Sequence, residues 1–399
     1  MRPRLLLLPL VAALVAIAAG CGGRFRLPTE QRISRVIPRD SSYSMLATWT
    51  GMTGIHDVLV TQGPGSQLFL LFNTGGNGPP SVPRGHVDLY PFSQPRPIGP
   101  PYFQPLRTLF NPIALTAAQG RLFVLDQGDS CQAHYDSTRG TCEANTTPFA
   151  DNHIPFSHLP ACWHVREYDS GGGDTLSTFT DTTFAQVYGI AADDNGFVYV
   201  SGIAIVLDTL QTDQRIRTRK FVSRVYRYAR GKLYPGVVHE PYDYDDVNMP
   251  TSPWHRDTSW VVFDGSGASS ISDPRGLCLS RYGSPTLFVA DQGNAAVKQV
   301  SVNAIGVGYV KVDGSETGVA FNQPSNVAAD LAGFFYVVDR GNRRVLRYDA
   351  SGGFVQVVNV EPDQAGQTLL DPVAVGVDDS VAYVADGGRN EVIRFKRRK

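Results

Sequence analysis

The sequence predicts an all-β protein folded as a six-bladed β-propeller. Strand–turn–strand segments recur along the chain, Gly and Pro are abundant at 40 and 27 residues, and extended helical periodicity is not seen after the N-terminus. The clearest segment is FFYVVDRGNRRVLRYD at 334–349, where Asp339, Gly341 and Asn342 stop an apolar run before VLRY resumes. Residues of these types tolerate positive φ in a tight turn, so the segment is predicted to be a β-hairpin.

The hairpin has copies at LFVADQGNAAVKQV (287–300) and AYVADGGRNEVIRF (382–395), with weaker versions upstream. Each copy follows a short apolar strand. Successive equivalent positions are separated by 58, 75, 87, 50 and 48 residues, and the positions are Ile55, Ile113, Tyr188, Arg275, Ser325 and Val373. A unit of about fifty residues with several strands is typical of a propeller blade, and the longer steps indicate insertions.

The repeat resembles the NHL repeat, best in the unit GVAFNQPSNVAADLAGFFYVVDRGNRRVLRYDASGGFV and nearly as well from Asp371 onward. The resemblance extends over roughly residues 50 to 399 and implies the six-bladed architecture of NHL and TolB-like propellers. It does not imply one function, because propellers include both enzymes and binding proteins.

The last unit ends after its third strand, at RFKRRK, so one strand is missing from the final blade. An open sheet edge invites aggregation, and a propeller must close its ring. The strand-like run YSMLATW at 43–49 is therefore predicted to supply the fourth strand of the last blade.

The first twenty residues are predicted to be a lipoprotein signal peptide. Arg2 and Arg4 precede an apolar run too short to span a bilayer, and small residues lead up to Cys21. We expect lipidation of Cys21, a tether over 21–42 and the propeller over 43–399. The alternative is a plain secretory signal. The predicted location is the bacterial cell envelope, lipid-anchored at the outer membrane or the periplasmic face, with the membrane as a partner.

The large insertions all fall where loops emerge on one face of a propeller. They are residues 73–85, 129–161, 202–223 and 233–260. Loops on a rigid scaffold often carry function, so this face is predicted to bind a protein, peptide or glycan, with Tyr242, Tyr244 and Trp254 as exposed aromatic side chains. The alternative is that the loops only cap the channel.

A second candidate site lies on the axis, because strand one of each blade lines it. The positions at the mouth of strand one are His56, Ile113, Tyr188, Arg275, Ser325 and Val373. Three of them, His56, Tyr188 and Arg275, are capable of acid, base or anion-binding work and are predicted to bind a ligand. The alternatives are a polar plug and a register shifted by one residue. An enzyme of lyase or hydrolase type around these residues is the second functional hypothesis.

The lyase that cleaves peptidyl-α-hydroxyglycine has an NHL-like propeller and binds zinc through histidines of different blades. Here His56 has no histidine counterpart at the other inner positions. A catalytic zinc needs three protein ligands. No catalytic residue and no cofactor is therefore predicted, and the balance of the sequence favours a binding module over an enzyme.

The insertion at 129–161 and its flank contain Cys131, Cys142 and Cys162. In an exported chain we expect a Cys131–Cys162 disulfide at the base of the loop, worth roughly 3–4 kcal/mol in the entropic model. Cys131–Cys142 is the second pairing. A zinc site is the other alternative, through Cys131, His134, His158 and Cys162. Cys278 is predicted to be a buried free thiol.

The charge of the chain is nearly balanced, with a net charge of −1, so no nucleic-acid partner is predicted. An aspartate recurs at one position of the repeat, which predicts hydrogen bonds from side chain to turn backbone, with calcium as an unsupported alternative. These residues are Asp126, Asp291, Asp339 and Asp386. Arg215, Arg217 and Arg219 alternate along a strand, as expected of a solvated face or an anion-binding one.

Overall fold

The computed structural model describes residues 43–63, 65–74, 84–100, 102–127, 135–136, 141–142, 163–181, 183–209, 217–231, 253–260, 270–303, 309–358 and 369–398. All of them belong to one compact unit, Arg39–Lys399. No helix in these ranges is long and apolar enough to cross a bilayer.

The described chain forms six antiparallel four-stranded sheets, one for each predicted blade. Strands are given from the axis outward. Blade 1 consists of β2 (Ile55–Val60), β3 (Leu68–Asn73), β4 (Gly85–Tyr90) and β5 (Leu106–Leu109), and blade 2 of β6 (Pro112–Ala118), β7 (Arg121–Asp126), β10 (His164–Asp169) and β11 (Ser177–Phe179). Blade 3 consists of β12 (Phe184–Ala192), β13 (Phe197–Thr209), β14 (Arg217–Arg230) and β15 (Trp254–Arg256). Blade 4 consists of β16 (Pro274–Ser280), β17 (Thr286–Asp291), β18 (Ala296–Ser301) and β19 (Tyr309–Val312), and blade 5 of β20 (Pro324–Ala329), β21 (Phe335–Asp339), β22 (Arg344–Tyr348) and β23 (Phe354–Val357). Blade 6 consists of β24 (Pro372–Val377), β25 (Val381–Asp386), β26 (Glu391–Arg397) and β1 (Tyr43–Trp49). A further two-stranded ribbon joins β8 (Tyr135–Asp136) to β9 (Thr141–Cys142).

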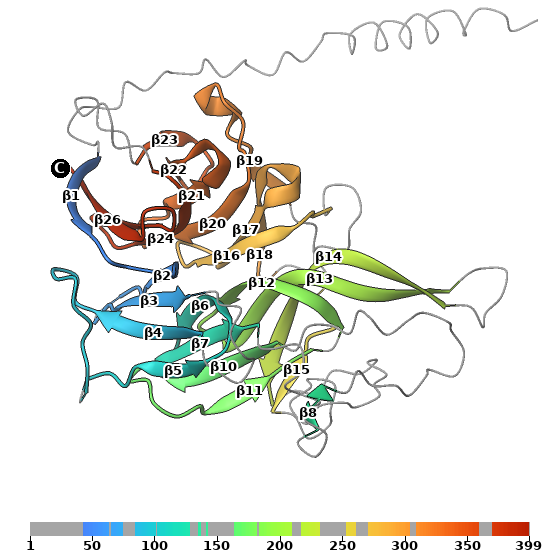
Figure 1. Ribbon diagram of the computed structural model, residues 1–399. Coiled ribbons are helices and arrows are strands. Elements are labelled where there is room, and N and C mark those ends of the chain that lie inside the picture. The colour runs from blue at the N-terminus through green and yellow to red at the C-terminus, as the bar shows by residue number, and fades with distance from the viewer. Residues whose placement is uncertain are drawn as a thin grey trace, which may run out of the picture. The chain divides into compact units, whose positions relative to one another are not determined.

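The six sheets are arranged around a common axis, with the first strand of each blade innermost (Figure 1). Each inner strand contacts the next one around the ring, and β24 contacts β2 to complete it. The helical elements in the described ranges include the single 3-10 turns η4 (Gln292–Asn294), η5 (Ser315–Thr317) and η6 (Arg340–Asn342). The predicted all-β, six-bladed propeller is confirmed.

The ring is closed as predicted, by a strand from the beginning of the chain. β1 pairs antiparallel with β26, in a register that sets Tyr43 opposite Arg397 and Trp49 opposite Val392. The Trp49 ring packs on Tyr90 of blade 1 at 5.9 Å between centroids and on Tyr383 of blade 6 at 6.2 Å. The closing strand therefore also joins the first blade to the last.

The hydrophobic core lies between neighbouring blades. Phe288 of blade 4 stacks on Phe335 of blade 5 at 4.6 Å, and Phe335 stacks on Tyr348 at 5.2 Å. Because both faces of each sheet are covered by other blades, the middle strands are apolar on both sides, and every residue of β25 is buried. This explains why the repeats read as continuous apolar runs.

The predicted hairpin at 334–349 is formed by β21 and β22. The turn is the 3-10 turn η6, and the positive φ belongs to Arg343, at 55°, whereas Gly341 has none. A Cβ on Gly341 would lie 2.4 Å from Cγ of Asn322. The glycine is thus required for a close approach of the preceding loop.

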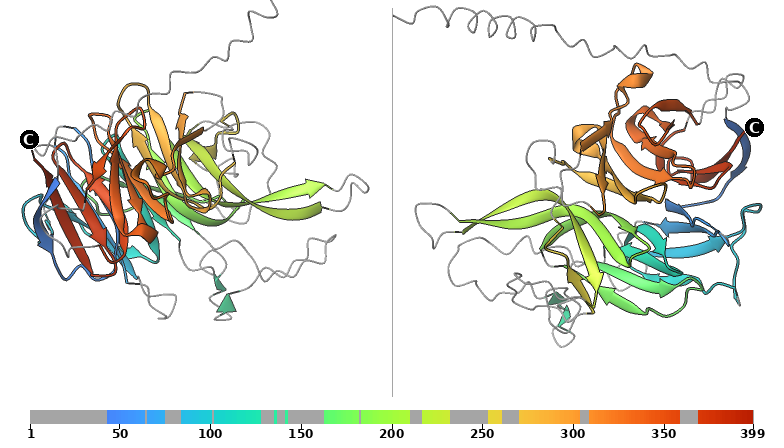
Figure 2. Two further views of the ribbon diagram at one scale, coloured as in Figure 1. Left: turned by 90° about the horizontal axis from the view of Figure 1, so that it is seen from above. Right: turned by 180° about the vertical axis from the view of Figure 1, so that it is seen from behind.

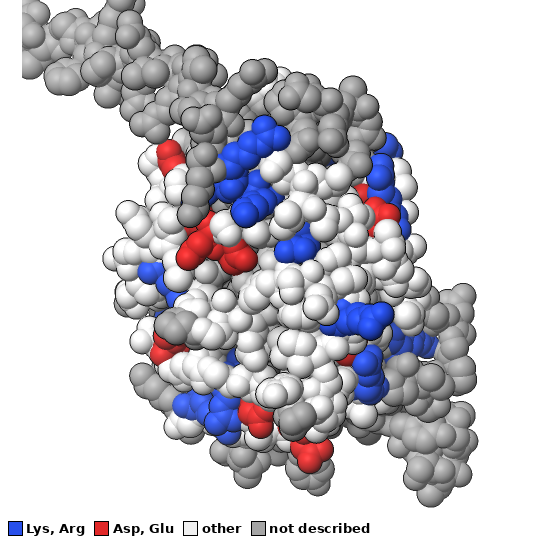
Figure 3. Space-filling model, turned by 90° about the vertical axis from the view of Figure 1, so that its left-hand side faces the viewer, with Lys and Arg blue, Asp and Glu red and all other residues white. Residues whose placement is uncertain are grey.

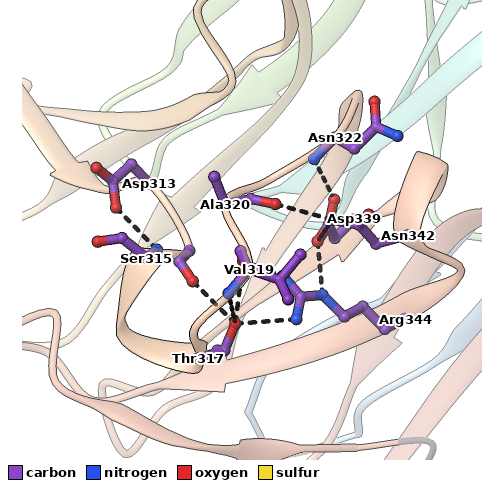
Figure 4. A network of polar contacts seen from close by, with 10 residues as sticks. Asp313, Ser315, Thr317, Val319, Ala320, Asn322, Asp339, Asn342 and Arg344 are labelled. Carbon is purple, nitrogen blue, oxygen red and sulfur yellow. Dashed lines mark hydrogen bonds and ion pairs between the residues drawn. The ribbon is translucent and has the colours of Figure 1, made fainter.

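Asp339 fastens this hairpin to the loop that enters strand one. Its buried carboxylate accepts hydrogen bonds from the Asn322 N–H at 2.7 Å, from Asn342 Nδ2 at 2.8 Å and from Arg344 Nε at 2.7 Å (Figure 4). The equivalent aspartates also accept backbone N–H groups of their entering loops: Asp126 from Phe110 and Asn111, Asp291 from Ser272, and Asp386 from Leu370 and Asp371. The recurring aspartates thus bond to backbone N–H groups, but mainly to those of the entering loop, and Asp386 also accepts from the turn N–H groups of Gly388 and Arg389.

Blade 3 extends into a two-stranded arm. β13 and β14 stay paired from Phe197–Ala229 to Thr209–Arg217, whereas β12 follows β13 no further than Ala204. The pair therefore runs on beyond the disc of blades (Figure 2). Arg217 and Arg219 occupy alternate positions of β14, and Arg215 lies outside the described residues.

Candidate ligand-binding site

A cavity of about 520 Å³ lies on the propeller axis and is lined by the first strand of every blade. All six equivalent positions predicted to face the axis contribute to its wall: His56, Ile113, Tyr188, Arg275, Ser325 and Val373. The structure thus brings together the three polar residues predicted to form an axial site. Five of the six are the second residue of strand one, and Tyr188 is the fifth residue of β12, which begins earlier.

Tyr188 and Arg275 form a stacked pair at the edge of this cavity. Cζ of Arg275 lies 4.0 Å from the centroid of the Tyr188 ring. The guanidinium donates from Nη2 to Oδ2 of Asp273 at 2.9 Å and from Nε to Oε1 of Gln292 at 3.2 Å. Burial and then the Asp273 carboxylate raise the pKa of Tyr188, with Arg275 opposing. The phenol therefore keeps its proton at neutral pH and donates it to Oε1 of Gln186 at 2.9 Å.

His56 projects from β2 into the cavity, where its side chain is in contact with solvent although cavity walls surround it. This surrounding protein lowers the pKa of His56, and the nearby charge of Arg340 acts in the same direction, while a hydrogen bond with the Ile113 backbone opposes both. The imidazole is therefore neutral at pH 7, with one donor and one acceptor nitrogen.

Arg340 is a wall residue that the sequence analysis did not single out. It lies in η6, between strands two and three of blade 5, and its Nε and Nη2 bind the Asp371 carboxylate at 2.5 and 2.8 Å. The residue belongs to the hairpin that defines the repeat. Nothing in the repeat pattern distinguishes a turn arginine that faces the axis from one that faces solvent.

Asp57 is the second residue that was missed, and it links three blades. Its buried carboxylate accepts from the Val58 N–H at 2.8 Å, from the Leu115 N–H of blade 2 at 2.9 Å and from Nδ2 of Asn326 in blade 5 at 3.4 Å. Burial raises the pKa of Asp57 to about 6. The signal that could have revealed it is a carboxylate inside the apolar strand IHDVLV.

Side chains cross the far end of the cavity. Nε2 of Gln62, from blade 1, donates to the Val377 carbonyl at 2.8 Å and to the Ala329 carbonyl at 3.3 Å, in blades 6 and 5. Arg281, from blade 4, lies 3.0 Å from Oδ2 of Asp194. These contacts tie the blades together below the level of His56 and Arg275.

The loop residues predicted to bind a ligand are not part of this cavity. Trp254 is 2% exposed on β15, and its Nε1 donates to Oγ of Ser177 at 3.0 Å. The expectation of an exposed Trp254 is wrong, because pairing of β15 with β14 turns the indole into the core between blades 2 and 3. Tyr242 and Tyr244 lie outside the described residues.

The predicted cysteine chemistry also falls mostly outside the described ranges. This holds for Cys21, Cys131, His134, His158 and Cys162, so the lipidation, disulfide and zinc predictions stay predictions. Cys278 is a free thiol on the cavity wall, and burial raises its pKa to about 12. Within the described part of the chain, no group of three His, Cys, Asp or Glu residues is arranged to hold a metal ion.

The sequence matches no protein-family model and no curated protein. Among solved structures, the chain is similar to a gluconolactonase from Xanthomonas campestris, with 12% identity and a TM-score of 0.43 over 86% of this chain and 88% of that one. It is also similar to regucalcin, a calcium-binding protein from Agrobacterium tumefaciens strain C58, with 10% identity and a TM-score of 0.48 over 90% and 96% of the two chains. At this level, neither likeness carries information about ligand or activity.

Proposed function

We propose that this protein is a binding protein of the bacterial cell envelope whose axial cavity holds a small polar ligand. The observation that carries the proposal is the convergence of six equivalent positions, one from each blade, on a single cavity of about 520 Å³. Ligand pockets for small molecules typically measure about 300–1,000 Å³ and contain a few convergent polar groups.

The polar groups of the wall suit a ligand bound by hydrogen bonds. Arg275, Tyr188 and Gln186 form one connected set, and His56 and Arg340 add a second. The inserted loops, predicted to bind a protein, peptide or glycan, lie largely outside the described residues, so the proposal is based on the cavity. Such a ligand would be a free small molecule or an end group of a larger partner.

The test is saturation-transfer NMR on the full chain, with a panel of monosaccharides, amino acids and small organic acids. Gln186→Trp places an indole in the cavity, since Gln186 is an exposed wall residue. Thr108→Trp, at an exposed position of the outer strand β5, is the matched control. Transfer to at least one panel member in the wild type and control, and its loss in Gln186→Trp, is expected. The proposal would be overturned if no panel member showed transfer, or if transfer were the same in Gln186→Trp as in the wild type.

A catalytic role is the second candidate, and His56 is the observation that favours it. A neutral imidazole in a cavity can accept a proton from a bound substrate, which is the work of a general base. The same NMR panel, followed for a day, would show conversion of a bound member by the wild type and its loss in His56→Gln. A member that binds but stays unchanged with the wild type would argue against catalysis.

The membrane anchor is part of the proposal and is supported by residues 1–21 of the sequence. In a bacterial host, the wild-type chain should partition into detergent with a diacylglyceryl thioether on Cys21, detectable by mass spectrometry of the N-terminal peptide. Cys21→Ser should partition into the aqueous phase. Equal partitioning of both proteins would contradict the anchor and would leave the cavity proposal unaffected.

A further inference from the structure

At the wall of the axial cavity, the side chains offer more hydrogen-bond donors than free acceptors. The charged wall residues in the described chain are three arginines, Arg275, Arg281 and Arg340, and one carboxylate, Asp57. The aspartates that pair with these arginines are not among the lining residues; they are Asp273, Asp194 and Asp371. Three cationic residues therefore line the cavity, while their counterions do not.

Two of these arginines are held in place before any ligand arrives. Arg275 is fixed by Asp273, Gln292 and the Tyr188 ring, and Arg340 by both oxygens of Asp371. A guanidinium has about five N–H donors, so each keeps several beyond those in use. The side chains of Arg275 and Arg340 are 37% and 44% exposed, so these donors are accessible. Little rotamer entropy is then lost when a ligand binds.

Two neutral amides of the wall, those of Gln186 and Asn111, add to the same imbalance, because their oxygens already accept hydrogen bonds. Oε1 of Gln186 accepts from Tyr188 at 2.9 Å, and Oδ1 of Asn111 accepts from Nδ2 of Asn73 at 2.6 Å. The NH₂ groups of Gln186 and Asn111 are what these wall residues retain for a ligand. Oγ of Ser325 is a buried hydroxyl for which the described chain provides no hydrogen-bond partner, and it lines the same cavity.

The carboxylate of Asp57 does not cancel this preference. Its oxygens accept from two backbone N–H groups and from Asn326, so they are directed into the wall. The pKa of Asp57 is set by burial and by these three hydrogen bonds, and no arginine contributes to it. Asp57 is therefore a structural link between blades, separate from the arginine pair.

We propose that the ligand of the axial cavity is a small oxyanion, a molecule with a carboxylate or phosphate group, bound by Arg275 and Arg340. This inference rests on the proposed function and names its ligand class. Two guanidinium groups form charge-assisted hydrogen bonds with oxyanions, and a preorganised pair favours them over neutral hydroxyl compounds.

The experiment measures the thermal midpoint of the full chain against inorganic phosphate, citrate and galactose, at constant ionic strength adjusted with sodium chloride. The variants are wild type, the double variant Arg275→Gln with Arg340→Gln, and Arg107→Gln as the control. Arg107 is matched because it also pairs with one aspartate, Asp88, but lies on the outer strand β5. Each midpoint shift is referred to the same variant without ligand, so a change in basal stability does not enter the comparison.

We expect saturable stabilisation by phosphate or citrate in the wild type and in Arg107→Gln, and an apparent affinity lower by about tenfold or more in the double variant. Preference between phosphate and citrate identifies the oxyanion. Stabilisation by galactose alone, lost in Gln186→Trp, would overturn the ligand class and leave the proposed function standing. Equal anion affinity in the wild type and double variant would overturn the inference. No response to any probe, together with a silent NMR panel, would overturn both.

Discussion

The carboxylate of Asp57 is buried where blades 1, 2 and 5 meet, and burial raises its pKa to about 6 from an ordinary value of 3.8. The protonated form is thus favoured in the folded state relative to the unfolded chain. Its contribution to stability is fully present below about pH 4 and is lost as the pH rises through 6. The three hydrogen bonds that the carboxylate accepts lower the pKa, but they do not cancel the effect of burial.

This predicts a difference in pH dependence between the wild type and Asp57→Asn, since an amide does not titrate. The free energy of unfolding of the variant, relative to wild type, should increase by about 3 kcal/mol from pH 4 to pH 7, because the pKa change is about two units. Urea unfolding at four pH values measures it. Asp174→Asn, at an exposed site, is the control, and a relative stability of Asp57→Asn that does not vary with pH would contradict the account.

Gly341 gives a second prediction at the residue scale. A Cβ there would lie 2.4 Å from Cγ and 2.7 Å from the carbonyl oxygen of Asn322, so Gly341→Ala should cost about 1–3 kcal/mol. At Gly99 a Cβ would have no atom within 4 Å and φ is not positive, so Gly99→Ala should change stability by less than about 0.5 kcal/mol. Chemical denaturation compares the two, and equal costs would remove the steric explanation.

At the scale of the element, three blades share a pair of residues that face each other across strands two and three. The pairs are Tyr199–Arg227, Tyr336–Arg347 and Tyr383–Arg394. In each, the guanidinium lies over an aromatic ring, for example Arg347 at 3.7 Å from the Phe334 centroid. A hydroxyl–carboxylate bond orients two of the tyrosines, Tyr199 toward Asp193 at 2.9 Å and Tyr336 toward Asp330 at 3.1 Å. In these pairs the arginine lies against an aromatic ring, and Arg227 also forms an ion pair with Asp257.

The link between hairpin and entering loop is the element-scale prediction. Asp339→Ala removes the acceptor for Asn322, Asn342 and Arg344, and leaves a largely buried guanidinium without its carboxylate. We expect a loss of about 3–5 kcal/mol in the free energy of unfolding. Asp313→Ala, at an exposed turn where the carboxylate accepts from the Ser315 N–H, should cost about 1 kcal/mol. Similar losses for both would show that Asp339 has no special role.

At the scale of the whole molecule, the ring is held together by contacts between the two ends of the chain. Besides the β1–β26 pairing, the hydroxyl groups of Tyr43 and Tyr336 lie 2.9 Å apart, so the closing strand reaches blade 5 as well as blades 1 and 6. Charge contributes locally. Figure 3 shows acidic and basic side chains lying near one another on one side of the molecule.

Ring closure predicts that Trp49 is critical for stability. Trp49→Ala should lower the free energy of unfolding by about 3–5 kcal/mol, because the indole is 3% exposed between Tyr90 and Tyr383. Leu46→Ala on the same strand, where the side chain is 46% exposed, should change it by less than about 0.5 kcal/mol. Urea unfolding with limited proteolysis of the C-terminal blade provides the measurement. Unaltered stability in Trp49→Ala would mean that β1 does not close the ring.

The sequence alone determined the architecture, because its signals are local and repeated. Each hairpin is encoded within about fifteen residues, the period reports the number of blades, and the missing strand after Phe395 identified 43–49 as its replacement. The recurring aspartate could also be interpreted, since its hydrogen bonds connect segments of one blade. The convergence of His56, Tyr188 and Arg275 followed once the repeats were aligned.

The tertiary structure decided what depends on distance across the ring. Arg340, Asp57 and Asn326 come from different strands or turns, and only the stacking of blades around the axis sets them on one cavity wall. Trp254 lies in a stretch of sequence that looks like a polar surface loop, yet pairing of its strand with β14 buries the side chain. Gly341 is required by a neighbour nineteen positions away, Asn322, which turn propensity cannot report. Contacts between segments remote in sequence depend on packing, and local pattern does not encode them.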